Sequence, residues 1–267
     1  MSPVLFHRNT PLFLVSIATI AFLYAPIVLL VVMSFNDSPY IAFPIQHTST
    51  RWYGLMLGND QLWQALGNSL RVGVIASLTA TLIAVLAAKA VTRYRFKGQR
   101  PTISLIMSPL VIPEVILGTA LLVLLLSAGL ELSLLTVTIG HVVICTPYAL
   151  AVMISRYAGF DPSLEEASFD LGETALGTFW RVTLPLLLPG VVSALLLSFL
   201  ISFDDFVVAF FLTGSERTLP VFVYNQLRFP KKLPEVLALA VCLLLISIVL
   251  VAFAEWLRRR DGAVEEI

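Results

Sequence analysis

Three carboxylates lie within or beside long apolar stretches of this sequence, where an acid is unusual. Glu114 follows two prolines, Pro109 and Pro113, while Asp204 and Asp205 are adjacent further along the chain. An acid in the middle of a membrane costs about 2.5–3.5 kcal/mol on insertion scales, so it usually faces a cavity or a partner. The three acids are therefore candidates for binding a cationic group, and pairing between helices is the alternative.

The helical period indicates how these acids are directed. Glu114 lies about twelve residues, or ~17 Å, into its stretch, and prolines before it free backbone carbonyls, so we expect a broken helix with a buried acid. Adjacent helical positions point about 100° apart, so Asp204 and Asp205 differ in direction. Ser198, Ser202 and Asp205 follow at spacings of four and three and form one polar stripe. We therefore favour Asp205 over Asp204 as the acid that faces a polar cavity.

Aromatic residues and a histidine give weaker signals. Trp52 and Tyr53 can contact a bound cation, but a tryptophan at this place is equally typical of an anchor at the membrane interface. His141, Cys145 and Tyr148 recur at helical spacing. We interpret that stripe as helix packing, with His141 as a hydrogen-bonded structural residue.

The composition indicates a membrane protein. The 267 residues are 58% hydrophobic and 13% charged, with a mean hydropathy of +0.91, whereas a soluble domain carries about 25% charged residues. The formal net charge of +0 gives no sign of nucleic-acid binding. Cys145 and Cys242 both lie in apolar runs, which favours small core residues over a disulfide or a metal pair.

Six apolar stretches are long enough to be membrane spans, because crossing a core of about 30 Å takes about 20 helical residues. They are Pro11–Phe35, Leu70–Val91, Ile103–Ala128, Leu132–Ile154, Leu186–Leu212 and Val236–Trp256. The first exceeds the 7–15 residues or so of a signal-peptide core, so we expect it to remain as a span. The sequence thus predicts an all-α integral membrane protein with a single transmembrane domain over residues 1–267.

The distribution of Lys and Arg favours cytoplasmic N- and C-termini. With that orientation, eleven of the 17 basic residues fall on the inner side and six on the outer side, as the positive-inside rule requires. The last outer loop, Arg217–Lys232, carries four of the six. That loop is either a tolerated charged loop or a surface that contacts a soluble partner.

The segment Asp161–Pro185 is the one substantial helical loop between spans. Asp161 suits the cap position and Pro162 the first helical position, and the helix dipole favours Glu165 and Glu166 in the first turns. Leucines and small residues at helical spacing, namely Leu164, Ala167 or Ser168, and Leu171, form an apolar face.

Gly172 can end this first helix, since glycine accepts the left-handed conformation. A second short helix is expected over Thr174–Arg181, with Pro185 closing it and opening the next span. An exposed apolar face of this kind needs a protein partner or the membrane interface.

The loop also carries a spaced motif: Glu-Ala-Ser, three residues, Gly, nine residues, Val, one residue, Leu-Pro. Its positions are Glu166, Ala167, Ser168, Gly172, Val182, Leu184 and Pro185. The pattern resembles the EAA loop of ABC importer permeases, departing only at Ser168, where the family has alanine, and at Val182, where it has isoleucine. The resemblance implies the type I importer fold, in which this loop and Glu165 dock as a coupling helix on a cytoplasmic ATPase subunit.

Most of the chain, roughly residues 20 to 255, resembles the permeases of spermidine/putrescine importers. The segments that carry the resemblance are Tyr24-Ala-Pro, Ser34-Phe-Asn, Arg51-Trp-Tyr-Gly, Pro109-Leu-Val-Ile-Pro-Glu114, Ser202-Phe-Asp-Asp205, Leu219-Pro220 and Pro234-Glu-Val-Leu-Ala-Leu-Ala. The chain departs from that family at Leu237, where asparagine is usual, and in Phe229-Pro-Lys-Lys. The resemblance implies a substrate pathway with residues Trp52, Glu114, Ser202, Asp204 and Asp205.

The same resemblance implies the partners and the location. They are a second homologous permease, two ATP-binding subunits that hold ATP and Mg²⁺, a periplasmic solute-binding protein and membrane lipid, in the bacterial cytoplasmic membrane. No Gly-Lys dipeptide occurs, so a P-loop is missing from this chain.

Other readings stay open from the residues alone. The same importer class also carries opines and amino-acid derivatives, and a stand-alone carrier could use Glu114 and Asp205 for ion coupling. An intramembrane enzyme has little support, because the sequence has neither HExxH nor GxSxG.

Overall fold

The computed structural model describes residues 10–40 and 43–262. That part of the chain is helical, and its only extended pairing is an isolated bridge between Asn36 and Thr48. The all-α prediction is confirmed. The chain divides into two compact units: residues 1–60 with 223–267, and residues 61–222. This division into units does not test the prediction of a single transmembrane domain, which stays a prediction.

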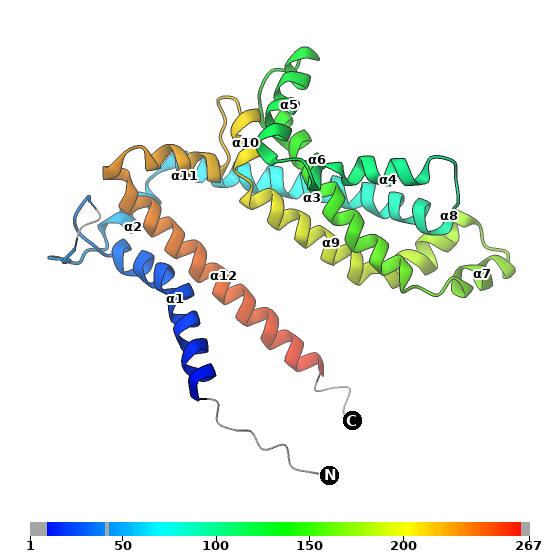
Figure 1. The fold of residues 1–267 in the computed structure, drawn as a ribbon, viewed down its shortest axis with the longest axis horizontal. Helices are drawn as coiled ribbons and strands as arrows, with labels where there is room; N and C mark the ends of the chain where they lie inside the picture. Colours follow the sequence, from blue (N-terminus) through cyan, green and yellow to red (C-terminus); the bar gives the residue numbers. More distant parts are fainter. Residues whose placement is uncertain (1–9, 41–42, 263–267) are drawn as a thin grey trace, which may run out of the picture. The chain divides into compact units, whose positions relative to one another are not determined.

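The first unit contains α1 (Thr10–Ser34), α2 (Arg51–Leu57) and α12 (Leu233–Gly262). The uniformly apolar α1 lies beside α12, which also packs against α2 (Figure 1). Two contacts fix the chain between α1 and α2. The Trp52 indole N–H donates to the carbonyl of Asn36 at 2.7 Å, and the hydroxyls of Ser34 and Tyr53 are 2.7 Å apart.

The second unit is organised around α3 (Asp60–Arg93), α6 (Leu134–Ala158) and α9 (Leu184–Asp204). α6 packs against α9 (Figure 1). One core cluster joins buried residues of all three helices. α3 presents a fully buried alanine at every fourth position: Ala76, Ala80, Ala84 and Ala88. A stripe of small residues lets helix backbones approach closely inside a membrane. α3 is therefore held by packing on one face, while its other face is apolar and exposed.

The third predicted span is broken, as the two prolines indicated. α4 (Gln99–Met107) continues as a 3-10 turn, Ser108–Leu110, and then meets α5 (Glu114–Ser127) at a bend of 108°. Pro113 sits immediately before α5 with an extended ψ of 130°. Five helices are long and apolar enough to cross a membrane, and the bent pair would make six. Within the described residues this agrees with the six predicted stretches.

The fifth predicted span differs from expectation at both ends. The helix starts early, because α8 (Ala175–Thr178) runs through a π-helical segment, Phe179–Thr183, directly into α9. Pro185 therefore does not close a separate helix. Proline cannot donate a backbone hydrogen bond. The wider turn of the π-helical segment just before Pro185 accommodates this missing bond in the first turn of α9. At the far end α9 stops at Asp204, and α10 (Val207–Leu212) follows an extended Asp205 with ψ of 123°.

Gly140 on α6 permits the close packing of α10. A Cβ at this position would collide with the side chains of Leu212 and Val208, whereas one at Gly67 on α3 would meet nothing within 4 Å. Gly140→Ala should lower the free energy of unfolding by about 1–3 kcal/mol through overpacking. Gly67→Ala should be neutral or stabilising, because alanine is the better helix former. Thermal unfolding in detergent tests the pair, and equal melting temperatures would contradict this packing.

Candidate functional site

The first turn of α7 (Ser163–Asp170) is shifted by one residue from its prediction. Pro162 occupies the cap position, and the Asp161 carboxylate accepts the N–H of Ser163 at 3.0 Å. That backbone hydrogen bond holds the pKa of Asp161 below its usual value. Asp161 thus closes a turn before α7 instead of capping the helix itself.

Glu165 is the buried charged centre of this region. Its carboxylate accepts Nε of Arg93 at 2.9 Å and the hydroxyl of Thr183 at 2.6 Å, and Nζ of Lys89 lies 3.6 Å away. Arg93 also donates to the carbonyl of Phe160 at 3.2 Å. A single carboxylate therefore ties α7 to the end of α3 and to the π-helical segment.

The sequence placed Glu165 only in the first turn of an exposed helix and missed this inward role. The available signal was the pair of Lys89 and Arg93, four residues apart at the end of an apolar run. Residues at this spacing share one helix face, and two cations on a face that meets a core require an acidic partner.

The predicted glycine stop is confirmed. Gly172 has φ of +86°, and the N–H of Glu173 bonds to the carbonyl of Ser168 at 3.1 Å, which is the Schellman arrangement. Ser168 also contacts Thr178 through their hydroxyls at 2.9 Å. This second contact joins α7 to α8 across the turn.

The expected apolar face of the loop is exposed. The exposed large apolar side chains are Leu164, Phe169, Leu171, Leu176 and Trp180, and Leu171 is 90% exposed. Glu166, Ala167 and Pro185 are also exposed, and Leu184 is half-buried. The motif residues therefore present a surface, whereas Glu165 beside them anchors that surface to the helices.

A second site is a pocket of about 480 Å³ in the second unit. Its lining residues are Pro109, Glu114, Ile144, Tyr148, Leu200, Ile201, Asp204, Asp205, Phe206 and Val207. Glu114 lies in the first turn of α5 and Asp204 at the end of α9, and both are exposed. The prediction that Glu114 is buried is therefore wrong, because the break at Pro113 turns it into the pocket. Glu114, Asp204 and Asp205 all line this pocket.

Asp205 caps a helix as well as lining the pocket. Its carboxylate accepts the N–H of Ala209 at 2.9 Å, and so caps α10, and its Oδ2 lies 3.2 Å from Nε2 of His141 without an aligned hydrogen bond. Both aspartates line the pocket, and Asp204 is exposed whereas the Asp205 side chain is 5% exposed, so the preference for Asp205 over Asp204 stays a prediction. The extended backbone at Asp205 directs its carboxylate to the free N–H groups of α10.

The polar stripe of Ser198 and Ser202 is buried against α6, not exposed to the pocket. The Ser202 hydroxyl lies 2.7 Å from Nδ1 of His141, and the thiol of Cys145 donates to the carbonyl of Ser198 at 3.3 Å. The structural role predicted for His141 is confirmed. Tyr148 differs from its neighbours on the stripe, since it is exposed and lines the pocket.

Trp52 belongs to the first unit. It is buried, donates to the carbonyl of Asn36, and carries the Arg51 guanidinium 4.3 Å above its ring. These contacts describe a residue that organises the segment after α1. Its role in a substrate pathway stays a prediction.

Replacing Glu165 should loosen the segment of residues 161–183. Glu165→Gln removes the charge that compensates Arg93 and Lys89, and breaking a buried ion pair costs about 3 kcal/mol or more. Glu166→Gln alters an exposed neighbour of the same type and should change little. Limited proteolysis should cleave the first variant faster within this segment. Equal cleavage of both variants would show that the Glu165 contacts do not hold it.

Comparison with known proteins identifies the family. The model described as "Binding-protein-dependent transport system inner membrane component" matches residues 80–260. The putrescine transport system permease protein PotI of Escherichia coli K12 is 38% identical over 243 residues, 88% of this chain and 85% of PotI. The spermidine/putrescine permease PotC of Haemophilus influenzae is 35% identical over 258 residues, 96% of this chain and 98% of PotC.

The solved structures agree on the fold. A chain of a bacterial ABC transporter for import of the acidic polysaccharide alginate superimposes with a TM-score of 0.73 at 18% identity, covering 92% of this chain and 98% of that one. A chain of the MetNI methionine ABC transporter gives 0.57 at 18% identity, covering 78% and 95%. The protein therefore belongs to the family of binding-protein-dependent transport system inner membrane components, as a multi-pass permease subunit of an ABC importer.

Proposed function

We propose that this permease forms half of a translocation pathway for a small cationic solute, a polyamine such as spermidine or putrescine. The observation that carries the proposal is the pocket in which Glu114 and Asp204 are both exposed, and among the described residues neither forms an ion pair. Unpaired carboxylates within membrane spans are suited to ammonium groups. The names of PotI and PotC support the same substrate class.

An opine or amino-acid derivative remains the second candidate substrate, since such a solute also carries a cationic group. The stand-alone ion-coupled carrier is set aside, because the chain belongs to an ABC importer family.

The proposed machinery needs further subunits. A second permease would complete the pathway, two ATP-binding subunits would hold ATP and Mg²⁺, and a periplasmic binding protein would deliver the solute. The structures of the alginate importer with its solute-bound periplasmic protein support a partner of the last kind. The basic segment Arg217–Lys232 was expected to be a loop, but most of it is helical, as α11 (Leu219–Leu227) and a 3-10 turn (Pro230–Lys232). It is a candidate contact for the binding protein.

The segment Asp161–Pro185, called the coupling loop from here on, is proposed to dock on an ATP-binding subunit through its exposed apolar side chains. The Glu165 contacts would then pass the movement of α7 to α3. They also place the basic connection after Arg93 on the same side as the loop, which supports a cytoplasmic location for both. Cytoplasmic N- and C-termini follow from that orientation.

Gly172→Val should reduce both solute transport and solute-stimulated ATP hydrolysis. A β-branched residue at φ of +86° strains the turn by about 1–3 kcal/mol, so the apolar face of α7 would be misplaced. Gly98→Val is the matched control, because Gly98 has φ of +88° and equally open surroundings but lies outside the loop. Solute-stimulated ATP hydrolysis by the assembled importer should fall only in the first variant. If both variants lose it to the same extent, general strain explains the effect.

Asp204→Asn and Glu114→Gln should each reduce polyamine uptake by about tenfold, the effect of one charge-assisted contact of about 1.4 kcal/mol. Neither should lower the melting temperature much, since both acids are exposed. Asp205→Asn should instead lower the melting temperature, because it weakens the cap of α10. Uptake of radiolabelled putrescine and spermidine into proteoliposomes measures the first effect. Full uptake by the double variant of Asp204 and Glu114 would refute the cationic pathway.

A further inference from the structure

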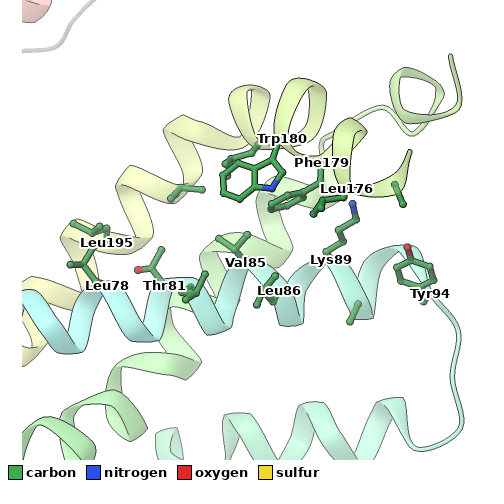
Figure 2. Close-up of a pocket in the computed structure, with 15 residues that line it drawn as sticks. Leu78, Thr81, Val85, Leu86, Lys89, Tyr94, Leu176, Phe179, Trp180 and Leu195 are labelled. Atoms are coloured by element: carbon green, nitrogen blue, oxygen red, sulfur yellow. The ribbon is translucent and has the colours of Figure 1, made fainter. Parts of the chain in front are cut away.

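An open groove of about 690 Å³ runs along α3 on the side of α8 and α9 (Figure 2). Its walls are almost entirely apolar, with leucines and valines such as Leu78, Leu82 and Val85 on one side and Leu195 on the other. Lys89, Tyr94 and Trp180 lie toward one end, whereas the hydroxyl of Thr81 lies among the leucines toward the other (Figure 2). Among the lining residues the only charged side chain, that of Lys89, thus lies at the end that also carries the aromatic residues.

The length of the groove matches one leaflet of a bilayer. Leu78 and Lys89 are eleven helical residues apart, or about 16 Å, while half of the hydrocarbon core is about 15 Å. Leu78 lies near the middle of the apolar part of α3, and Lys89 near its end. A transmembrane helix of a partner would cross the full core of about 30 Å, so this groove would cover only half of it.

The polar end has the chemistry of a headgroup site. Nζ of Lys89 lies 3.6 Å from Glu165 and 4.9 Å from the centre of the Phe179 ring. Arg93 shares the same carboxylate, and Lys89 also lines the groove, so its ammonium group is placed to meet a phosphate. Tyr94 and Trp180 are exposed beside it, and such aromatic side chains are enriched at the level of lipid headgroups.

We infer that this groove binds an anionic phospholipid from the leaflet on the side of the coupling loop. An acyl chain lies along Leu78, Leu82 and Val85, and the phosphate meets Lys89. The bound lipid contacts the π-helical segment and the Glu165 cluster, which consists of Glu165, Lys89, Arg93 and Thr183. It therefore lies beside the contacts that connect α7 to α3.

The assembled importer tests this site in nanodiscs of phosphatidylcholine with or without phosphatidylglycerol. Native mass spectrometry after release counts the phospholipid that remains bound. Lys89→Gln should reduce retention of phosphatidylglycerol about fivefold, the effect of one lysine near a headgroup. Arg95→Gln removes a charge from the exposed connection after α3 and should retain the lipid as the unchanged protein does.

A second pair of variants tests the groove without touching the Glu165 cluster. Leu86→Trp narrows the groove and should remove the bound lipid, whereas Ile83→Trp places the same bulk on an exposed part of α3 outside the groove. Unchanged lipid retention in both Leu86→Trp and Lys89→Gln would overturn the site. The site would also be overturned if the Leu86→Trp variant failed to assemble with the second permease while the Ile83→Trp variant assembled normally. That result would show that a helix of the partner protein fills the groove.

Discussion

The arrangement of the segment Asp161–Thr183 in the second unit depends on the contacts of the Glu165 carboxylate. This carboxylate is buried, and it meets Arg93 and Lys89 of α3 and Thr183 of the π-helical segment. A buried charge is tolerated only when paired and hydrogen-bonded, so these segments must move as one body or break the cluster. The exposed apolar face of α7 is consequently fixed to a membrane-spanning helix, as the proposed coupling role requires.

Two breaks in the spanning helices create the acidic pocket. The bend at Pro113 brings Glu114 to the start of α5, and the extended residue Asp205 ends α9 just after Asp204. Each break frees backbone groups, which inside a membrane must be satisfied by protein or face a cavity. Asp205 satisfies the start of α10, and its neighbour Asp204 thereby remains available to the pocket. The carboxylates are adjacent in sequence but differ in function, because one serves the backbone and the other faces open space.

The pocket and the groove place different chemistry on the same unit. The pocket joins unpaired acids to an exposed tyrosine, Tyr148, and the groove joins an apolar channel to Lys89 and two aromatic residues. Acidic groups in the first and the ammonium group of Lys89 in the second favour a cationic solute and an anionic lipid, respectively. The Glu165 cluster adjoins the groove through Lys89, so lipid and coupling loop share one charged centre.

The sequence by itself determined the class of this protein, its long apolar helices, the break before Glu114 and the left-handed Gly172, because long apolar runs, prolines and glycines act through local backbone and solvent preferences. It also carried the spaced motif that resembles the EAA loop of ABC importer permeases. Only the tertiary structure decided which acids are free. The helical period assumed a continuous helix through Asp205, whereas the chain breaks there, so that Asp205 caps α10 while Asp204 is exposed in the pocket. The inward turn of Glu165 was likewise a matter of tertiary contact, since its direction depends on cations seventy or so residues earlier in the chain, at Lys89 and Arg93.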